Sequence, residues 1–169
     1  AVHVGTLHFT CKDVIRAFKG DMMPGDVYAI NDPYAGGTHF SDVRLVRPIF
    51  DEDVLIGFSQ SNGHWSDLGG SVPGSFDVTA KDMFREAVRI TPVRLFRAGD
   101  FCSDVANLIA NNTRDQAMLG DFEKAVQDAI LDSGAAQQKQ TNALFSTPDK
   151  FQMFKNIIYE ILNSDPKWD

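Results

Sequence analysis

The sequence predicts an α+β fold: a mixed sheet built on hairpins around a His/Asp site, with helices mainly in the second half of the chain. Three observations predict it. Apolar runs at residues 43–50 and 54–60 flank an acidic turn at 51–53, as in a β-hairpin. Apolar residues at helical spacing prevail after residue 100. The 169 residues are 43% hydrophobic and 23% charged, which is ordinary for a globular domain with its own core.

The beginning of the chain is predicted to contain two strands and one short helix. Residues 1–9 alternate loosely between apolar and polar side chains, which predicts a strand. Residues 12–19 have apolar side chains on one helical face and are expected to form a short helix. A turn at 22–26 then leads into an apolar strand over 27–30. Pro33 has no N–H to donate, so this strand must end before it.

Helical patterns prevail after the hairpin. Residues 79–88 carry apolar side chains on one face, with Thr79 as a candidate N-cap, which predicts a helix. A short strand is expected over 93–96, followed by a helix over 100–112. A longer amphipathic helix is predicted over 113–132.

The chain is expected to divide into three parts. Residues 1–132 carry most of the predicted elements and form one domain portion. Residues 133–147 are polar and Gln-rich, which indicates a linker, and residues 148–169 are expected to form a C-terminal helix and a polar tail. Because the chain opens at Ala1 without an initiator methionine, we expect it to be a fragment.

Composition and charge narrow the class of protein. The net charge of −7 argues against a general nucleic-acid or anionic-membrane surface. Cys11 and Cys102 form no metal-binding pattern, and such an isolated pair is expected to be two reduced thiols, which indicates a cytoplasmic protein. No apolar run reaches the roughly 18 residues of a membrane span, and no signal peptide is visible.

A short pattern occurs twice around the predicted hairpin. His39 is followed three residues later by Asp42, and His64 three residues later by Asp67, with glycines beside both pairs. The hairpin would bring its two open ends together, and these pairs sit at those ends. Two imidazoles and a carboxylate suit Mn, Fe or Zn. Open coordination positions would let such a metal polarise a carbonyl or activate water.

Other polar residues have simpler interpretations. Asp32 stands before a proline and is better explained as a turn-former than as a ligand. Arg89, Arg94 and Arg97 could bind phosphate, but a solvated face explains them as well. His8 is expected to be structural. The sequence contains no P-loop pattern for ATP and no local motif that marks a Ser or Cys nucleophile.

Four segments, in this order, closely resemble the hydantoinase B/oxoprolinase family. The most specific segment is residues 25–42, which ends Asn-Asp-Pro-Tyr-Ala-Gly-Gly-Thr-His-Phe-Ser-Asp. It is followed by residues 64–75 (His-Trp-Ser-Asp-Leu-Gly-Gly, then Pro-Gly-Ser), 86–93 (Glu-Ala-Val-Arg-Ile-Thr-Pro-Val) and 111–121. The resemblance covers roughly residues 1–130. Members of the family are much longer, so the chain resembles an N-terminal piece of a larger subunit.

The resemblance implies an enzyme that works with a partner. Members are parts of ATP-dependent amidohydrolases that cleave hydantoin, N-methylhydantoin or 5-oxoproline, or related subunits of acetone and acetophenone carboxylases. It implies a hetero-oligomer in which a hydantoinase A-type subunit binds ATP and phosphorylates the substrate. The chain itself would then act on the activated intermediate.

The resemblance also implies site residues. In the carboxylase members, a histidine, an aspartate three residues later and a second histidine hold a divalent metal, which corresponds to His39, Asp42 and His64. Asp67 would be a fourth ligand or a carboxylate that orients His64, and Asp67 and His3 are the candidate catalytic residues. Many members have two histidines in the second motif, where this chain has His64 followed by tryptophan. A ligand from that second position would be missing here.

Three functions stay open at this point. The first is a metal-bearing part of an ATP-dependent hydrolase acting on a cyclic amide, and the second is the same part of a ketone carboxylase. The third is a non-catalytic scaffold in which the His/Asp set only stabilises the fold. A bound metal with open positions would favour an enzyme, whereas a closed or metal-free site would favour the scaffold.

Overall fold

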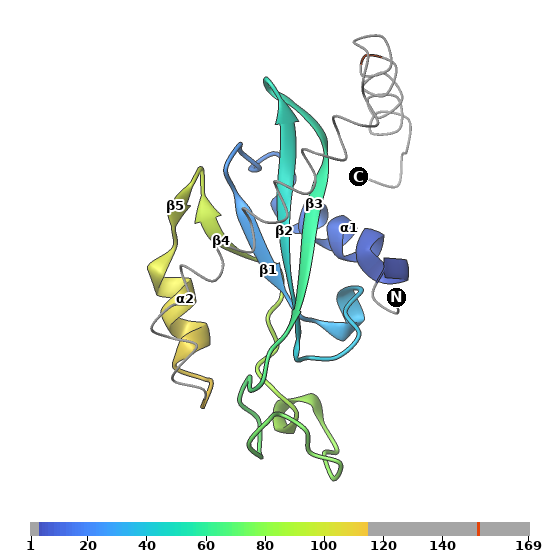
Figure 1. Cartoon of the computed structure of the whole chain (residues 1–169), viewed down its shortest axis with the longest axis vertical. Helices are drawn as coiled ribbons and strands as arrows, with labels where there is room; N and C mark the ends of the chain where they lie inside the picture. Colours follow the sequence, from blue (N-terminus) through green and yellow to red (C-terminus); the bar gives the residue numbers. More distant parts are fainter. Residues whose placement is uncertain (1–3, 115–151, 153–169) are drawn as a thin grey trace.

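The computed structural model describes residues 4–114 and residue 152, and its centre is a five-stranded sheet in the order β3-β2-β1-β4-β5 (Figure 1). The strands are β1 (Val27–Ile30), β2 (Asp42–Asp51), β3 (Val54–His64), β4 (Val93–Arg97) and β5 (Asp100–Phe101). The helices are α1 (Leu7–Phe18) and α2 (Ser103–Ala110), with short 3-10 turns η1 (Val4–Thr6), η2 (Pro33–Ala35) and η3 (Met83–Arg85). The α+β class is confirmed, but every pairing among the described strands is antiparallel, so a mixed sheet is not observed here.

The central strand β1 is buried on both faces, and it separates two apolar clusters. Tyr28 and Ile30 pack with Val14 of α1 on one face of the sheet. Val27 and Ala29 point to the other face, where α2 and the loops between β3 and β4 pack. Successive side chains of a strand alternate between faces, so one four-residue strand serves both clusters. The described part is therefore layered, with α1 on one face and α2 with the loops on the other.

The predicted hairpin is confirmed. Strands β2 and β3 pair from Asp42 opposite His64 down to Asp51 opposite Val54. Both strands extend further toward their open ends than the apolar runs alone indicated. The predicted strands over 27–30 and 93–96 are confirmed as β1 and β4.

The strand predicted over residues 1–9 is wrong for the described part, where α1 begins at Leu7. The apolar positions Cys11, Val14 and Phe18 are spaced by three or four residues, and they form one helical stripe toward the sheet. Phe9, which suggested strand alternation, is largely exposed. The helical spacing of 3.6 residues therefore decided the structure of this segment, and the looser strand-like alternation did not.

The helix predicted over residues 79–88 is also wrong, because only η3 is helical there. Asp82, rather than Thr79, caps this turn by accepting hydrogen bonds from the backbone N–H groups of Phe84 and Arg85. The N–H of Val88 then donates to the Leu68 carbonyl, and the Arg85 carbonyl accepts from Ser71. These long-range bonds divert the backbone from a helical ladder. The helix predicted over 100–112 is confirmed in part, since the short β5 precedes α2.

Several predictions lie outside the described residues. They are the helix over 113–132, except for its first two positions, and the domain boundaries at 132/133 and 147/148. The longer of the two described helices, α1, lies in the first half of the chain, which differs from the expected placement of the helices. None of the helices in the described part has the length and apolar character required to cross a membrane.

Candidate functional site

The open end of the β2–β3 hairpin brings His39, Asp42 and His64 together. Asp42 and His64 are cross-strand partners. The Nδ1 atom of His64 lies 2.8 Å from Asp42 Oδ1, and the Nδ1 atom of His39 lies 2.9 Å from Asp42 Oδ2. The two imidazole centroids are 6.4 Å apart, and the rings are nearly perpendicular. One carboxylate therefore holds two histidines that are 25 residues apart in the sequence.

Burial differs sharply among these three side chains. The Asp42 side chain is 1% exposed, whereas those of His39 and His64 are 71% and 68% exposed. Asp42 also accepts hydrogen bonds from the backbone N–H of His39 at 3.1 Å and from the Thr38 hydroxyl. With both Nδ1 atoms hydrogen-bonded to the carboxylate, Nε2 is the ring nitrogen of each imidazole that does not contact Asp42.

The loop that carries His39 is fixed at several points. Asp32 caps η2 by accepting from the Tyr34 N–H at 3.0 Å, which confirms it as a turn-former. Gly36 ends this turn with φ of +85°, and a Cβ there would lie 2.6 Å from Cβ of Phe9. The amide of Asn31 donates to the Phe40 carbonyl at 2.8 Å. These bonds explain why the loop approaches the hairpin closely enough for His39 to reach Asp42.

A buried arginine lies behind the carboxylate. Arg44 is fully buried, and its guanidinium donates to the Thr10 hydroxyl, to the Gly36 carbonyl, and to Asn62 Oδ1 at 3.3 Å. Burial lowers the pKa of Arg44, and the neighbouring Asp42 carboxylate opposes that shift. Asp42 thus has a buried cation beside it as well as the two imidazoles.

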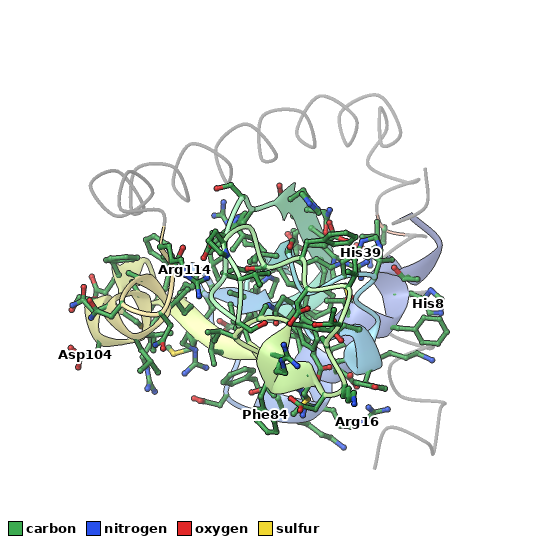
Figure 2. All side chains as sticks on the ribbon, turned by 90° about the horizontal axis from the view of Figure 1, so that it is seen from below. His8, Arg16, His39, Phe84, Asp104 and Arg114 are labelled. Carbon is green, nitrogen blue, oxygen red and sulfur yellow. The ribbon has the colours of Figure 1, made fainter. Side chains whose placement is uncertain are left out.

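The two histidines border a pocket of about 700 Å³, which we call the His pocket. Its wall includes apolar side chains of the loops, among them Tyr34, Phe76 and Met83. In the view from below the sheet, these loops lie between His39 on one side and Arg114 on the other (Figure 2). The lining also includes the charged side chains of Lys81, Asp82 and Glu86, so the pocket is mixed in character, and it is a candidate site for a small molecule with polar groups.

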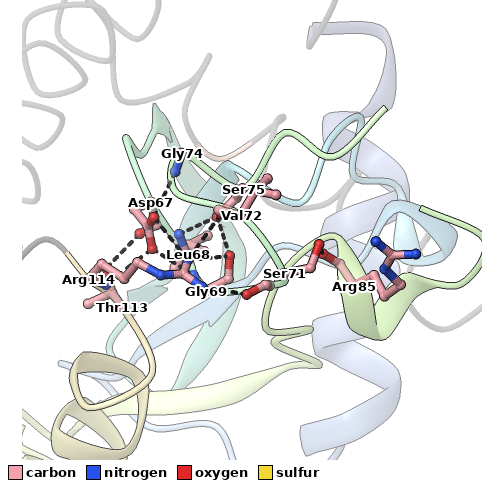
Figure 3. Close-up of polar contacts among 11 residues, drawn as sticks. Asp67, Leu68, Gly69, Ser71, Val72, Gly74, Ser75, Arg85, Thr113 and Arg114 are labelled. Atoms are coloured by element: carbon pink, nitrogen blue, oxygen red, sulfur yellow. Dashed lines mark hydrogen bonds and ion pairs between the residues drawn. The ribbon is translucent and has the colours of Figure 1, made fainter. Parts of the chain in front are cut away.

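Asp67 lies in a different set of contacts from His64. Its carboxylate accepts from the backbone N–H groups of Gly69 and Gly74, both at 2.8 Å, and from Arg114 (Figure 3). Burial alone would raise the pKa of Asp67, but these three backbone bonds and the Arg114 guanidinium outweigh it and lower the pKa to about 2. The carboxylate that contacts His64 is that of Asp42.

The other candidates occupy structural positions or lie outside the described residues. His3 belongs to the latter group. Arg89 pairs with Asp32, and Arg97 pairs with Asp21 at 3.6 Å. Arg94 is mostly buried and pairs with Asp26 and Asp21, so it is not part of a solvated face. Exposed His8 lies on α1.

Sequence reasoning did not single out Thr38, Arg44 or Arg114. Thr38 lies inside the His-containing motif, and its position directly before His39 was the only available signal. Arg44 is a charged residue within an apolar strand, and such a residue can indicate a buried polar contact. Arg114 has no local signal, because its partners are more than 40 residues away in the sequence.

The fit of a metal to these residues can be tested on the donor set. Among the described residues, no three His, Cys, Asp or Glu side chains are already arranged as a metal site. The imidazole and carboxylate donors of His39, Asp42 and His64 nevertheless suit a divalent transition metal. Ligand atoms about 2.1 Å from one ion lie about 3.4 Å apart in tetrahedral and about 3.0 Å apart in octahedral coordination. The hydrogen-bonded Nδ1 and carboxylate oxygen atoms here, at 2.8 and 2.9 Å, lie slightly closer together than that. These three residues could therefore hold such an ion.

Comparison with known proteins gives consistent relatives. The family model described as hydantoinase B/oxoprolinase matches residues 1–143. The chain is 35% identical over 116 residues to the caprolactamase subunit beta of Pseudomonas jessenii, covering 69% of this chain and 20% of that protein. It is 32% identical over 100 residues to 5-oxoprolinase 1 of Arabidopsis thaliana, covering 59% of this chain and 8% of that protein.

Two solved structures share the fold. The ATP-dependent caprolactamase of Pseudomonas jessenii has a TM-score of 0.78 at 28% identity, covering 95% of this chain and 27% of that chain. A nucleotide-free acetone carboxylase has a TM-score of 0.72 at 21% identity, covering 91% of this chain and 21% of that chain. This chain thus spans a quarter or less of the length of the relatives that it matches in sequence.

Proposed function

The chain belongs to the hydantoinase B/oxoprolinase family, and we propose that it is the metal-bearing part of an ATP-dependent hydrolase that opens a cyclic amide. The observation that carries the proposal is the convergence of His39 and His64 on the buried Asp42 carboxylate at the edge of the His pocket. The sequence relatives named caprolactamase and 5-oxoprolinase support a lactam as the substrate.

We assign the ligand role to His39, Asp42 and His64, with Mn, Zn or Fe as the ion. When bound, the metal would act as a Lewis acid on the amide carbonyl or on a water molecule. The residues of the His pocket would bind and orient the ring beside the two imidazoles. Asp67 is assigned to holding a loop, because its carboxylate is already used by backbone N–H groups and Arg114. His3 stays a prediction.

ATP is proposed to be used by a hydantoinase A-type partner. The sequence has no P-loop pattern of its own. The relative from Pseudomonas jessenii is named as a beta subunit, and its solved structure is described as ATP-dependent. Both names support a hetero-oligomer in which this chain supplies the hydrolytic site.

The test uses the full-length protein purified with its ATP-using partner. We expect about one Mn, Zn or Fe per chain by elemental analysis, and ATP-dependent ring opening of caprolactam or 5-oxoproline. His64→Ala and Asp42→Asn should lose both the metal and the activity. Asp53→Asn is the matched control, because Asp53 lies at the turn of the same hairpin, about 30 Å from Asp42 for ten strand residues.

Other outcomes identify the alternatives. ATP-dependent carboxylation of a ketone with bicarbonate, without lactam cleavage, would contradict the hydrolase and assign the ketone carboxylase, whose fold relative is acetone carboxylase. Normal metal content in both ligand variants would exclude the proposed site. Absence of metal from the wild-type protein, with neither activity, would favour the scaffold.

A further inference from the structure

The segment of residues 67–76 borders two pockets at the loop-covered end of the sheet. Residues 74–76 line the His pocket, together with His39 and His64. Residues 69–71 line a second pocket of about 850 Å³. The segment is thus a wall between the two, and its position sets the shape of the His pocket on one side.

Arg114 binds this wall through several acceptors at once. Its Nη1 atom shares two N–H groups among three acceptors, the Asp67 carboxylate at 3.3 Å and the carbonyls of Gly69 and Val72 at 3.2 and 3.1 Å. Its Nη2 atom donates to the Gly70 carbonyl at 2.6 Å. A planar guanidinium has five N–H donors and can serve four acceptors, whereas a lysine ammonium has three donors at a single point.

Asp67 also holds residues 67–76 in place, from inside the segment; we call the bonds of Arg114 and Asp67 to this segment the clamp. Its two carboxylate oxygens accept the backbone N–H groups of Gly69 and Gly74, both at 2.8 Å. The Thr113 hydroxyl donates to the Asp67 backbone carbonyl at 2.7 Å, next to Arg114 in the sequence. The wall is therefore tied to the chain that follows α2 (Figure 3).

These bonds fix a segment that regular structure does not fix. Residues 65–82, all described, form neither a helix nor a strand. The Arg114 side chain is 44% exposed and belongs to neither apolar cluster, so its loss would leave both clusters intact. Its contacts therefore act on the shape of the wall, in which Leu68 is the residue that belongs to a core cluster.

We propose that Arg114 is a positioning residue for the proposed reaction: it holds residues 67–76 so that Gly74, Ser75 and Phe76 form one wall of the substrate pocket. The inference rests on the proposed function, because the pocket matters only if a substrate binds beside His39 and His64. A displaced wall weakens substrate binding while the groups that act on the bond remain in place, so the effect falls on KM.

The experiment compares Arg114→Ala and Arg114→Lys in the full-length protein with its partner. Arg97→Ala is the matched control, since Arg97 is an exposed arginine of β4 that pairs with Asp21. Hydrogen exchange of peptides covering residues 67–76 measures the clamp without any substrate. Elemental analysis measures the metal content, and steady-state kinetics with caprolactam or 5-oxoproline measure KM and kcat.

We expect Arg114→Ala to raise KM about tenfold with kcat within about threefold of wild type, together with faster exchange in residues 67–76 and unchanged metal content. The KM of Arg114→Lys should lie between those of wild type and Arg114→Ala. If Arg114→Ala is too unstable to measure, the KM of Arg114→Lys tests the positioning role. Unchanged KM in both variants, or a loss of kcat alone in proportion to unfolded protein, would overturn the positioning role. A wild-type protein that cleaves neither lactam would overturn the proposed function, and this inference with it.

Discussion

At the residue scale, the candidate site combines one buried carboxylate with two exposed imidazoles. A buried anion is costly unless hydrogen bonds or charges compensate it. Asp42 is compensated by the backbone N–H of His39, by the Thr38 hydroxyl and by both imidazoles. The carboxylate is therefore the fixed element of the site, and it sets where the two rings lie.

Asp67→Asn should lower the free energy of unfolding by an amount that depends on pH. The pKa of Asp67 is lowered from 3.8 to about 2 in the folded chain, so its stabilisation is fully present above pH 4 and is lost as pH falls toward 2. The shift corresponds to about 2 kcal/mol. In denaturant unfolding of the purified chain, the difference between wild type and Asp67→Asn should shrink by about this amount between pH 6 and pH 2. The exposed Asp53→Asn should show no such trend, and a constant difference for Asp67→Asn would contradict the assignment.

At the element scale, two apolar runs with an acidic turn between them predicted the hairpin, and the open end of the hairpin predicted where the site residues meet. The apolar runs and the acidic turn were sufficient to place Asp42 near His64. The loops between β3 and β4 were not predictable, because bonds between distant residues hold them: Val88 to Leu68, and Ile90 to Asn31. Local patterns carry no signal of such partners.

The same reason explains which side chains around the site were missed. Asp42 and His64 are recognisable because their residue types suggest ligands. Arg44 and Arg114 act through carbonyl groups of other segments, and any residue type can supply a carbonyl. The convergence of His39, Asp42 and His64 could therefore be predicted from the sequence, whereas the groups that hold these side chains in place could not.

Gly70→Ala should destabilise the loop that Arg114 holds. Gly70 has φ of +82°, and a Cβ there would lie 2.4 Å from the Glu86 carbonyl oxygen and 2.7 Å from that of Arg85. Left-handed backbone and a clash with backbone atoms together should cost more than about 2 kcal/mol. Gly57→Ala in β3 is the matched control, because nothing lies within 4 Å of its Cβ position, and we expect a change within about 0.5 kcal/mol. Equal stabilities of the two variants in denaturant melts would disprove the close approach.

At the scale of the whole molecule, Arg44 joins parts of the chain that are far apart in sequence. From β2, its guanidinium reaches Thr6 and Thr10 at the start of α1, the Gly36 carbonyl in the loop before His39, and Asn62 on β3. One buried cation therefore links the helix layer, the sheet and the loop of the candidate site.

Arg44→Met should consequently lower both the free energy of unfolding and the metal affinity of the candidate site. The methionine fills part of the space but removes the donor to the buried Thr10 hydroxyl and to the partly buried Gly36 carbonyl, and it removes the positive neighbour of Asp42. Breaking such a buried charged network costs about 3 kcal/mol or more. Arg47→Met is the control, because half-buried Arg47 lies on the same strand, and it should change stability by less than about 1 kcal/mol. Denaturant unfolding measures the first effect, and metal affinity of the full-length protein measures the second. A loss of stability with unchanged metal affinity would show that the loop carrying His39 keeps its position without Arg44.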